Sequence, residues 1–435
     1  MFKSFFPNPR LFFSSAVVYS ALCCFIWYGF NEQIGQFLGF DMSSAEPVIG
    51  LGHFVTSSFL LFYCYYLVCT GIFAAYWFLV AKHKWQWWSI IGSAFILFST
   101  YFGVQVSVAI NNWRRPFFDL VQNALGASAT KDPDADKVVV SEEAVSSFTA
   151  ELLDLIVIFA EIAFLAIFVY VLTRFFVSHY VFRWRNAMND YYTARWADVR
   201  HIEGASQRIQ EDTMRFADIM ENLGVSIVDS VMTLLAFLPV LWALSDYVTE
   251  LPLVGEIAHP LFVAALAWSI FGTFLLLGVG IKLPGLFFRN QRVEAAFRKE
   301  LVQGEKRTDV LEGEIDESDT YANPATLKQL FDNVRKNYFR IYFHYMYFNV
   351  ARMFYLQADN IFVYILLIPT IAVGAITFGL LQQILTAFSQ VSNSFQILVH
   401  SWGTIIELLS VHKRLASFEA AIKGEPLPQI DQLAA

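Results

Sequence analysis

Five glutamates could transfer protons, because they recur at helical spacing in two polar stretches of the chain. Glu294 and Glu305 are eleven residues apart, which on a helix places them within about 20° of each other and roughly 16 Å apart along one stripe. Glu211 and Glu221 are ten residues apart, and Glu203 lies about two turns before Glu211. Carboxylates whose pKa is raised by burial or by a neighbouring acid can exchange protons near neutral pH. The same spacing is also typical of a solvated helix face, and spacing alone favours that simpler interpretation.

Charged residues also interrupt the long uncharged stretches. They are Asp154, Glu161, Asp229, Arg352, Asp359 and Glu407. Ionisable groups at membrane depth are costly and usually face the interior of a helix bundle. Asp154 and Glu161 are seven residues apart and share a helix face, and so do Arg352 and Asp359. A structural ion pair inside the bundle is the simpler expectation for Arg352 and Asp359.

Other kinds of chemistry find little support in the sequence. The four cysteines lie in uncharged runs without the paired spacing of a zinc site, so we expect them to be small apolar packing residues. We find no nucleophile with a base and no cluster of metal ligands, so the sequence predicts neither an enzyme nor a cofactor. The net charge of −8 offers no basic surface for nucleic acid.

The elements that must position these charges are membrane helices. Hydrophobic residues make up 56% of the 435 residues and charged residues only 16%, well below the roughly 25% of soluble domains. A span needs about 20 apolar residues, and Pro369 and Gly374 favour a break inside the longest uncharged run. The sequence therefore predicts an all-α, multi-pass membrane protein with about eight spans, at 11–30, 54–80, 90–110, 155–176, 225–244, 261–281, 346–368 and 376–399.

The charges of the loops predict the orientation of these spans. Basic residues follow every second span: Lys82 and Lys84, Arg183 to Arg200, Lys282 to Lys299, and Lys413 with Arg414. The opposite loops are acidic, apart from Arg114 and Arg115. Because cytoplasmic loops carry the excess of Lys and Arg, both termini are expected in the cytoplasm, and Glu407 at the cytoplasmic end of the last span.

The chain divides into four parts on this interpretation. Residues 1–84 hold two N-terminal spans, 85–415 hold a six-helix core, and 416–435 form a tail. Spans four to six are expected to continue as helices into the cytoplasm. Within the core, the acidic and aperiodic stretch 306–325 reads as a flexible linker, and the polar stretch 126–150 reads as a mobile loop.

Several long strings carry a family resemblance. "NNWRRPFFDLVQNAL" (111–125) and "VEAAFRKELV" (293–302) resemble the membrane domain of peroxisomal-type ABC transporters. "FFVSHYVFRWR" (175–185), "QEDTMRF" (210–216) and "RIYFHYMYFN" (340–349) resemble the SbmA/BacA family of bacterial inner-membrane peptide transporters, as do "IKLPGL" (281–286) and "NQRVEAA" (290–296). The similarity covers nearly the whole chain. No phosphate-cradling G-x-x-x-x-G-K-[ST] string occurs, so no ATPase domain is expected here.

The resemblance implies a function that the residues alone do not. It implies a homodimer in the bacterial inner membrane that admits antimicrobial, proline-rich and other peptides by alternating access, driven by protons, with glutamates lining the proton path. With the resemblance included, a proton-carrying role for four glutamates is as well supported as a solvated helix face. These are Glu211, Glu221, Glu294 and Glu305. Two alternatives stay open: an ABC-type lipid or very-long-chain fatty-acyl exporter that works with a separate ATPase subunit, and a membrane scaffold that transports nothing.

Overall fold

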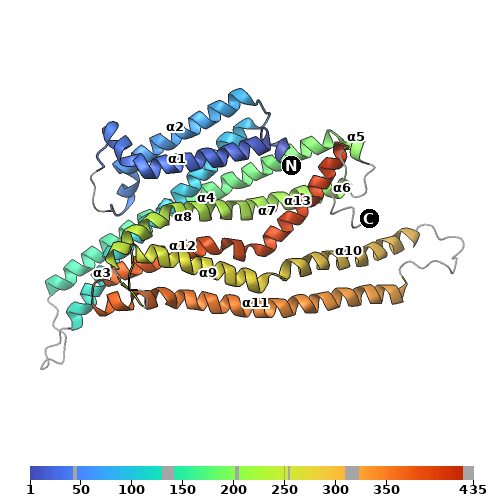
Figure 1. The fold of residues 1–435 in the computed structure, drawn as a ribbon. Coiled ribbons are helices and arrows are strands. Elements are labelled where there is room, and N and C mark those ends of the chain that lie inside the picture. The colour runs from blue at the N-terminus through green and yellow to red at the C-terminus, as the bar shows by residue number, and fades with distance from the viewer. Residues whose placement is uncertain are drawn as a thin grey trace.

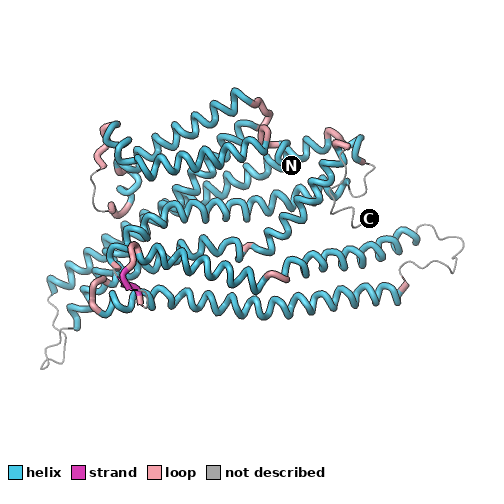
Figure 2. Tube along the Cα trace, in the orientation of Figure 1, coloured by secondary structure: helices cyan, strands magenta, loops and turns pink. Residues whose placement is uncertain are grey.

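The fold comes from a computed structural model of the chain and is almost entirely helical (Figure 2). It describes residues 1–42, 47–129, 142–200, 205–248, 250–252, 255–308 and 323–424. The longer helices are α1 (Pro9–Phe37), α2 (Ser57–Val80), α3 (Ser93–Ala129), α4 (Glu142–Thr193), α8 (Val225–Leu244), α9 (Pro260–Gly280), α10 (Leu283–Thr308), α11 (Pro324–Ala372), α12 (Phe378–His400) and α13 (Trp402–Ile422). The short ones are α5 (Trp196–Val199), α6 (Ala205–Gln207) and α7 (Thr213–Ile219).

Shorter elements complete the chain. Three 3₁₀ turns are η1 (Phe2–Ser4), η2 (Leu51–Val55) and η6 (Ser245–Tyr247), and three π-helical segments are η3 (Trp87–Gly92), η4 (Arg208–Asp212) and η5 (Met220–Gly224). The strands β1 (Glu250–Leu251) and β2 (Gly255–Glu256) pair antiparallel, with Glu250 opposite Glu256. This hairpin closes one end of the bundle, between α8 and α9 (Figure 2).

Local sequence signals explain where several helices begin and end. The Thr56 hydroxyl accepts a hydrogen bond from the Phe59 N–H at the start of α2, and Asn323 accepts one from the Ala325 N–H before Pro324 at the start of α11. Helix α11 ends just before Gly374, whose φ of +71° is left-handed. The predicted break near Pro369 and Gly374 is therefore confirmed.

The membrane prediction is confirmed for the fold class. In the described part of the chain, seven helical stretches are long and apolar enough to span a bilayer: Pro9–Phe37, Ser57–Val80, Trp87–Gly126, Val145–Thr193, Ala205–Tyr247, Pro260–Val302 and Pro324–Ala372. The eighth span expected from the sequence corresponds to α12, which is not among these seven; Gln and Asn side chains interrupt its apolar residues. The chain is thus an all-α, polytopic membrane protein.

Helix α12 lies at the centre of the packing. It contacts α3, α8 and α9, and its buried residues Leu380, Ile384, Ala387, Phe388 and Val391 join a core cluster with those helices. Helix α10 packs on α11, and α7 packs on α4 and α13. In Figure 1 the α1–α2 hairpin lies along one edge of the bundle, and α10 and α11 lie along the other.

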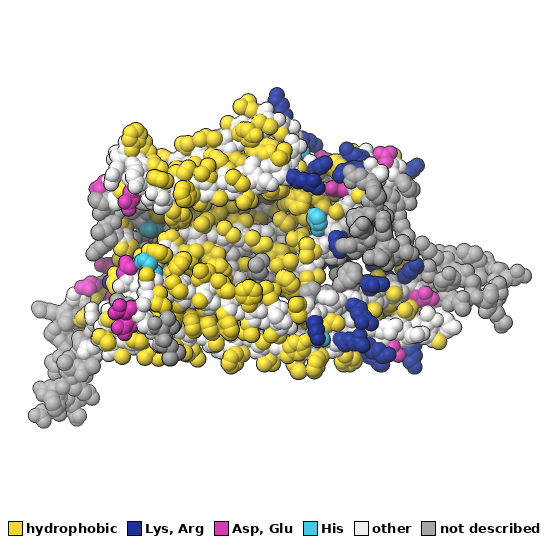
Figure 3. Space-filling view, viewed as in Figure 1, with side chains coloured by type: hydrophobic (Ala, Val, Ile, Leu, Met, Phe, Trp, Pro, Cys, Tyr) yellow, Lys and Arg dark blue, Asp and Glu magenta, His cyan; other side chains and the backbone are white. Residues whose placement is uncertain are grey.

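Basic side chains gather at one end of the bundle. Figure 3 shows a wide hydrophobic band, with Lys and Arg at the end where the N-terminus, α5 and the end of α13 lie, and with Asp and Glu at both ends. Helices α4 and α10 extend into the basic end, as the sequence predicted.

Some boundaries differ from the prediction. The expected mobile loop 126–150 is helical at both ends, because α3 runs to Ala129 and α4 begins at Glu142. Helix α13 runs to Ile422, past the expected boundary at 415. Helix α10 continues to Thr308, and residues 309–322 of the predicted linker lie outside the described residues.

Candidate functional site

The polar segment before α8 is the most distinctive part of the basic end. It forms one continuous path from α6 through η4, α7 and η5 into α8, and its two π-helical segments hold Glu211 and Glu221. A π-helical segment adds one residue to a turn and is frequently found at functional sites. Ten residues of regular α-helix between the two glutamates would amount to about three turns; the two widened turns change that spacing.

Asp212 forms the best-defined ion pair of this segment. Its side chain is only 2% exposed, and the Arg414 guanidinium on α13 donates to both of its oxygens, with a shortest N···O distance of 2.7 Å. Arg208, one turn earlier, also reaches Asp212, at 3.2 Å. Sequence reasoning did not single out Asp212. Its i,i+4 spacing from Arg208 was a visible signal, but the partner on α13 is 202 residues away.

Glu211 belongs to a second, more exposed network. It accepts a hydrogen bond from Gln207 at 2.9 Å and pairs with Arg215 at 2.8 Å, and Arg215 also reaches Glu407 on α13 at 3.5 Å. Glu211 precedes the apolar span of α8. The Gln207 hydrogen bond, together with the positive charge of Arg215, holds the pKa of Glu211 below its ordinary value, although partial burial and Asp212 oppose this. In this conformation Glu211 is therefore held in its ionised form.

Glu221 connects η5 to α4. Its Oε1 accepts a hydrogen bond from the Ser178 hydroxyl at 2.7 Å and lies 3.6 Å from an Arg174 guanidinium nitrogen. Arg174 also donates to the side chain of Asn222 at 2.9 Å. A pocket of about 340 Å³ adjoins Glu221 and is also lined by Ser178, His179 and Asp218.

Two of the other predicted glutamates lie on a different helix. Glu294 and Glu305 both lie on α10, which packs on α11 at the far edge of the bundle (Figure 1). Glu294 is half-buried. The side chain of Glu305 and the whole of Glu203 lie outside the described residues. Within one chain the candidates thus form two groups, one on the α6–α8 path and one on α10.

The charges inside the spans have different environments. Asp359 accepts hydrogen bonds from the Trp268 indole N–H at 2.7 Å and from the Ser392 hydroxyl at 3.0 Å, which come from α9 and α12. Arg352 is half-buried about two turns before Asp359 on α11. Asp154, Glu161 and Asp229 are exposed on α4 and α8. The hydrogen bonds that the structure shows to Asp359 come from neutral donors, so the expected pair with Arg352 stays a prediction.

Helix α12 also carries a seam of polar side chains through the bundle. Gln383 donates to the Asn112 side-chain carbonyl at 3.1 Å, and Gln396 donates to both Ser392 and Tyr355. These groups are buried, and their hydrogen bonds tie α12 to α3 and α11. A search of the described residues finds no group of three His, Cys, Asp or Glu side chains that could hold a metal ion.

Comparison with known proteins identifies the family. The model of the SbmA/BacA-like family matches residues 82–423. The inner membrane ABC transporter ATP-binding protein YddA of Escherichia coli (strain K12) is 24% identical over 341 residues, which cover 74% of this chain and 55% of that protein. The ABC transporter D family member 2, chloroplastic, of Arabidopsis thaliana is 22% identical over 271 residues, covering 58% of this chain and 35% of that protein.

The chain thus spans about half the length of the first of these relatives and about a third of the second. The match covers α3 to α13 and so includes the polar segment described above, whereas α1 and α2 lie outside it. The chain therefore belongs to the SbmA/BacA-like family and is similar in sequence to part of ABC transporter proteins.

Proposed function

We propose that this protein imports peptides across the bacterial inner membrane as a homodimer, by alternating access driven by the proton gradient. The basic end of the bundle lies in the cytoplasm in this proposal, because Lys and Arg are enriched on that side of membrane proteins (Figure 3). Family membership supports transport, and the resemblance to bacterial peptide transporters supports peptides as the cargo.

The observation that carries the proposal is that the acids of the α6–α8 path are bonded to other helices. Glu221 is bonded to α4, and Arg215 joins Glu211 to Glu407 on α13. A proton that neutralises one of these carboxylates removes the charge that holds its arginine. Proton uptake is then linked to the separation of helices at the cytoplasmic end, as alternating access requires.

The low pKa of Glu211 fits this linkage. While Arg215 and Gln207 are in place, Glu211 stays ionised. Protonation near neutral pH requires a different conformation, in which the bridge has opened and burial raises the pKa of Glu211 above its ordinary value. Glu294 and Glu305 on α10 are proposed to serve the second face of the pathway.

The dimer is supported by the charges of α4. Asp154 and Glu161 are exposed on a helix that is otherwise apolar along this length. Carboxylates at membrane depth face a partner or a water-filled space, because contact with hydrocarbon is costly. A second copy that closes a shared polar pathway would provide that environment.

The experiment that tests this function uses purified protein in proteoliposomes. A fluorescent proline-rich peptide should accumulate when a pH gradient is imposed without ATP, and a proton-conducting uncoupler should abolish the accumulation. Liposomes without protein are the control. Uptake that is insensitive to the gradient would overturn the proposal.

A second function has one observation in its favour. YddA is named as an ABC transporter ATP-binding protein, and this chain aligns to only 55% of it. An ABC-type exporter of lipids or very-long-chain acyl groups, with a separate ATPase subunit, fits that coverage. It predicts flux that requires ATP and the second subunit, and that a pH gradient alone does not drive.

A further inference from the structure

A cavity of about 510 Å³ lies between the α1–α2 hairpin and the core. Its walls come from α1, α2, α3, α4 and the η5–α8 segment. On α1 it follows one stripe, from Phe12 through Ala16, Tyr19 and Cys23 to Trp27. Fifteen residues of helix cover about 22 Å, so the cavity is long as well as large. Its volume is within the roughly 300–1,000 Å³ of sites for small ligands.

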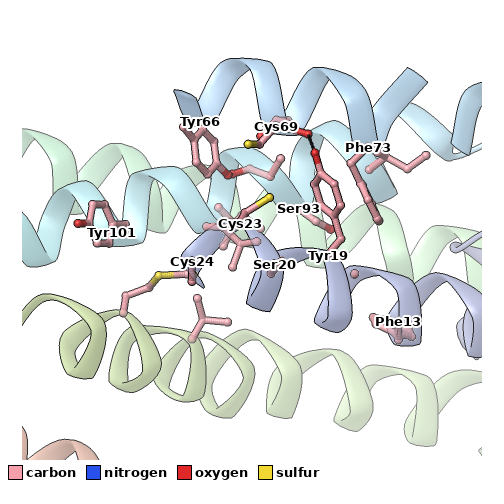
Figure 4. Close-up of a pocket in the computed structure, with 18 of the residues that line it drawn as sticks. Phe13, Tyr19, Ser20, Cys23, Cys24, Tyr66, Cys69, Phe73, Ser93 and Tyr101 are labelled. Carbon is pink, nitrogen blue, oxygen red and sulfur yellow. Dashed lines mark hydrogen bonds between the residues drawn. The ribbon is translucent and has the colours of Figure 1, made fainter. Parts of the chain in front are cut away.

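The walls present rings and carbon chains. Figure 4 shows Tyr19, Ser20 and Cys23 of α1 near Cys69 and Phe73 of α2, with the hydrogen bond between Tyr19 and Cys69 dashed. Six tyrosines also line the cavity. The hydroxyls of Tyr101 and Tyr180 are hydrogen-bonded to the side chains of Gln105 and Ser93, and the other four donate to main-chain carbonyl groups of neighbouring helices. The bonds are Tyr19 to Cys69, Tyr65 to Cys23, Tyr28 to Leu235 and Tyr66 to Ala94, at 2.6 to 2.9 Å.

These bonds restrict what the cavity can hold. The hydroxyl groups of these four tyrosines donate to main-chain carbonyls and so hold α1, α2, α3 and α8 together, which leaves their ring carbons to line the cavity. Water in such a cavity lacks the two to four polar partners that it needs. An empty apolar cavity of this size destabilises the bundle, because the side chains that line it lose van der Waals contacts. The occupant that satisfies both conditions is a long hydrocarbon.

The position of the hairpin identifies the source of that hydrocarbon. Val18, Leu22 and Phe25 are exposed on the side of α1 away from the cavity, as expected for a helix in contact with lipid. A bilayer leaflet supplies acyl chains about 15 Å deep, half of the roughly 30 Å hydrocarbon core. We propose that the cavity binds one acyl chain of a bilayer phospholipid, inserted between the α1–α2 hairpin and the core. The inference does not depend on the transported substrate.

Photo-crosslinking tests this inference with the full chain in liposomes. The probe is a phosphatidylethanolamine that carries a diazirine in its acyl chain, and mass spectrometry maps the attached residues. Wild-type protein should be labelled at Tyr19, Cys23 and Cys69, in addition to outer-face residues such as Leu22 and Phe25. Cys23→Phe places a ring in the cavity and should abolish the inner labels while the outer ones remain.

Cys64→Phe is the matched control, because Cys64 is exposed on α2 and is not part of the walls. It should retain the inner labels. Cys69→Phe fills the cavity from the α2 side and should reproduce the loss, which guards against misfolding of a single variant. The proposal is overturned if wild-type protein shows no inner labels, or if these labels persist in both filled variants. It is also overturned if an added proline-rich peptide displaces the inner labels, since the cavity would then be part of the peptide pathway.

Discussion

Arg414 donates three hydrogen bonds to the carboxylate of Asp212, two from Nε at 3.1 Å and one from Nη2 at 2.7 Å. The pair joins α13 to the π-helical segment η4, and the carboxylate is almost completely buried. The planar guanidinium can donate from two nitrogens to both oxygens of a carboxylate, whereas the ammonium group of lysine has a single nitrogen. The bridge therefore fixes the C-terminal helix against the polar segment that holds Glu211.

Removing the guanidinium should destabilise the fold. Arg414→Met leaves the buried Asp212 with Arg208 as its remaining described cationic partner, and breaking a buried pair in this way costs about 3 to 5 kcal/mol. Arg215→Met is the matched control, because Arg215 and its partners Glu211 and Glu407 are 31% to 47% exposed. Exposed pairs contribute only about 0 to 1 kcal/mol. Thermal unfolding in mild detergent should show a large drop for Arg414→Met and a small one for the control; equal drops would contradict the structure.

The indole of Trp268 should stabilise the membrane core through Asp359. Trp268→Phe keeps a ring but removes the N–H that donates to Asp359 at 2.7 Å. Asp359 is half-buried and keeps the Ser392 hydrogen bond, so losing this donor should cost about 1 kcal/mol, the low end of the range for such a loss. Trp242→Phe is the control, because the Trp242 side chain is 49% exposed. The same thermal measurement should separate the two variants, and an unchanged midpoint for Trp268→Phe would show that the hydrogen bond contributes little.

The ionisation of Glu211 should persist under mild acid. Its pKa is depressed below the ordinary 4.5, so its bridge contributes stability that is fully present above pH 4.5 and is lost as the pH falls through the lowered pKa. Between pH 7 and pH 5 the carboxylate should stay ionised in this conformation. Infrared difference spectra, with Glu211→Gln to assign the band, measure this directly. A titration midpoint above 4.5 would show that Gln207 and Arg215 do not hold the charge.

The amino-acid sequence predicted the membrane helices well because each depends on local composition. Apolar runs placed most of the spans, and Pro369 with Gly374 placed the end of α11. The bridges depend on contacts between distant segments. The sequence alone does not indicate that Asp212 pairs with Arg414, or Glu221 with Ser178, because the partners are far apart in the chain. The π-helical segments η4 and η5 were not predicted either, because the extra residue in such a turn shifts the helical register without changing the composition.

The orientation in the membrane follows from the charges at the basic end. A reporter that is active only in the periplasm should be silent when fused at Ala435 and active when inserted at Ser128. The physical reason is that Lys82, Arg183 and Arg414 flank spans on the same side, which places them in the cytoplasm. Activity at Ala435 combined with silence at Ser128 would reverse the proposed topology. Activity at both positions would require an odd number of spans.

The role of the glutamates is tested by removing their charge while keeping their shape. Gln retains the size and an amide that can hydrogen-bond, but it cannot ionise. Glu→Gln at Glu211, Glu221, Glu294 or Glu305 should therefore strongly reduce peptide uptake driven by a pH gradient, while expression and dimer formation persist. Peptide binding should survive better than uptake, because binding needs only one protonation state. Glu256→Gln is the matched control: Glu256 is exposed in the β1–β2 hairpin at the opposite end of the bundle, and peptide uptake by this variant should equal that of the parent.

If the acids merely form a solvated face, each change should shift stability by less than about 1 kcal/mol and leave flux unchanged. Four variants that all transport normally would eliminate the proton-carrying role. A loss confined to Glu211 and Glu221 would assign it to the α6–α8 path and exclude α10.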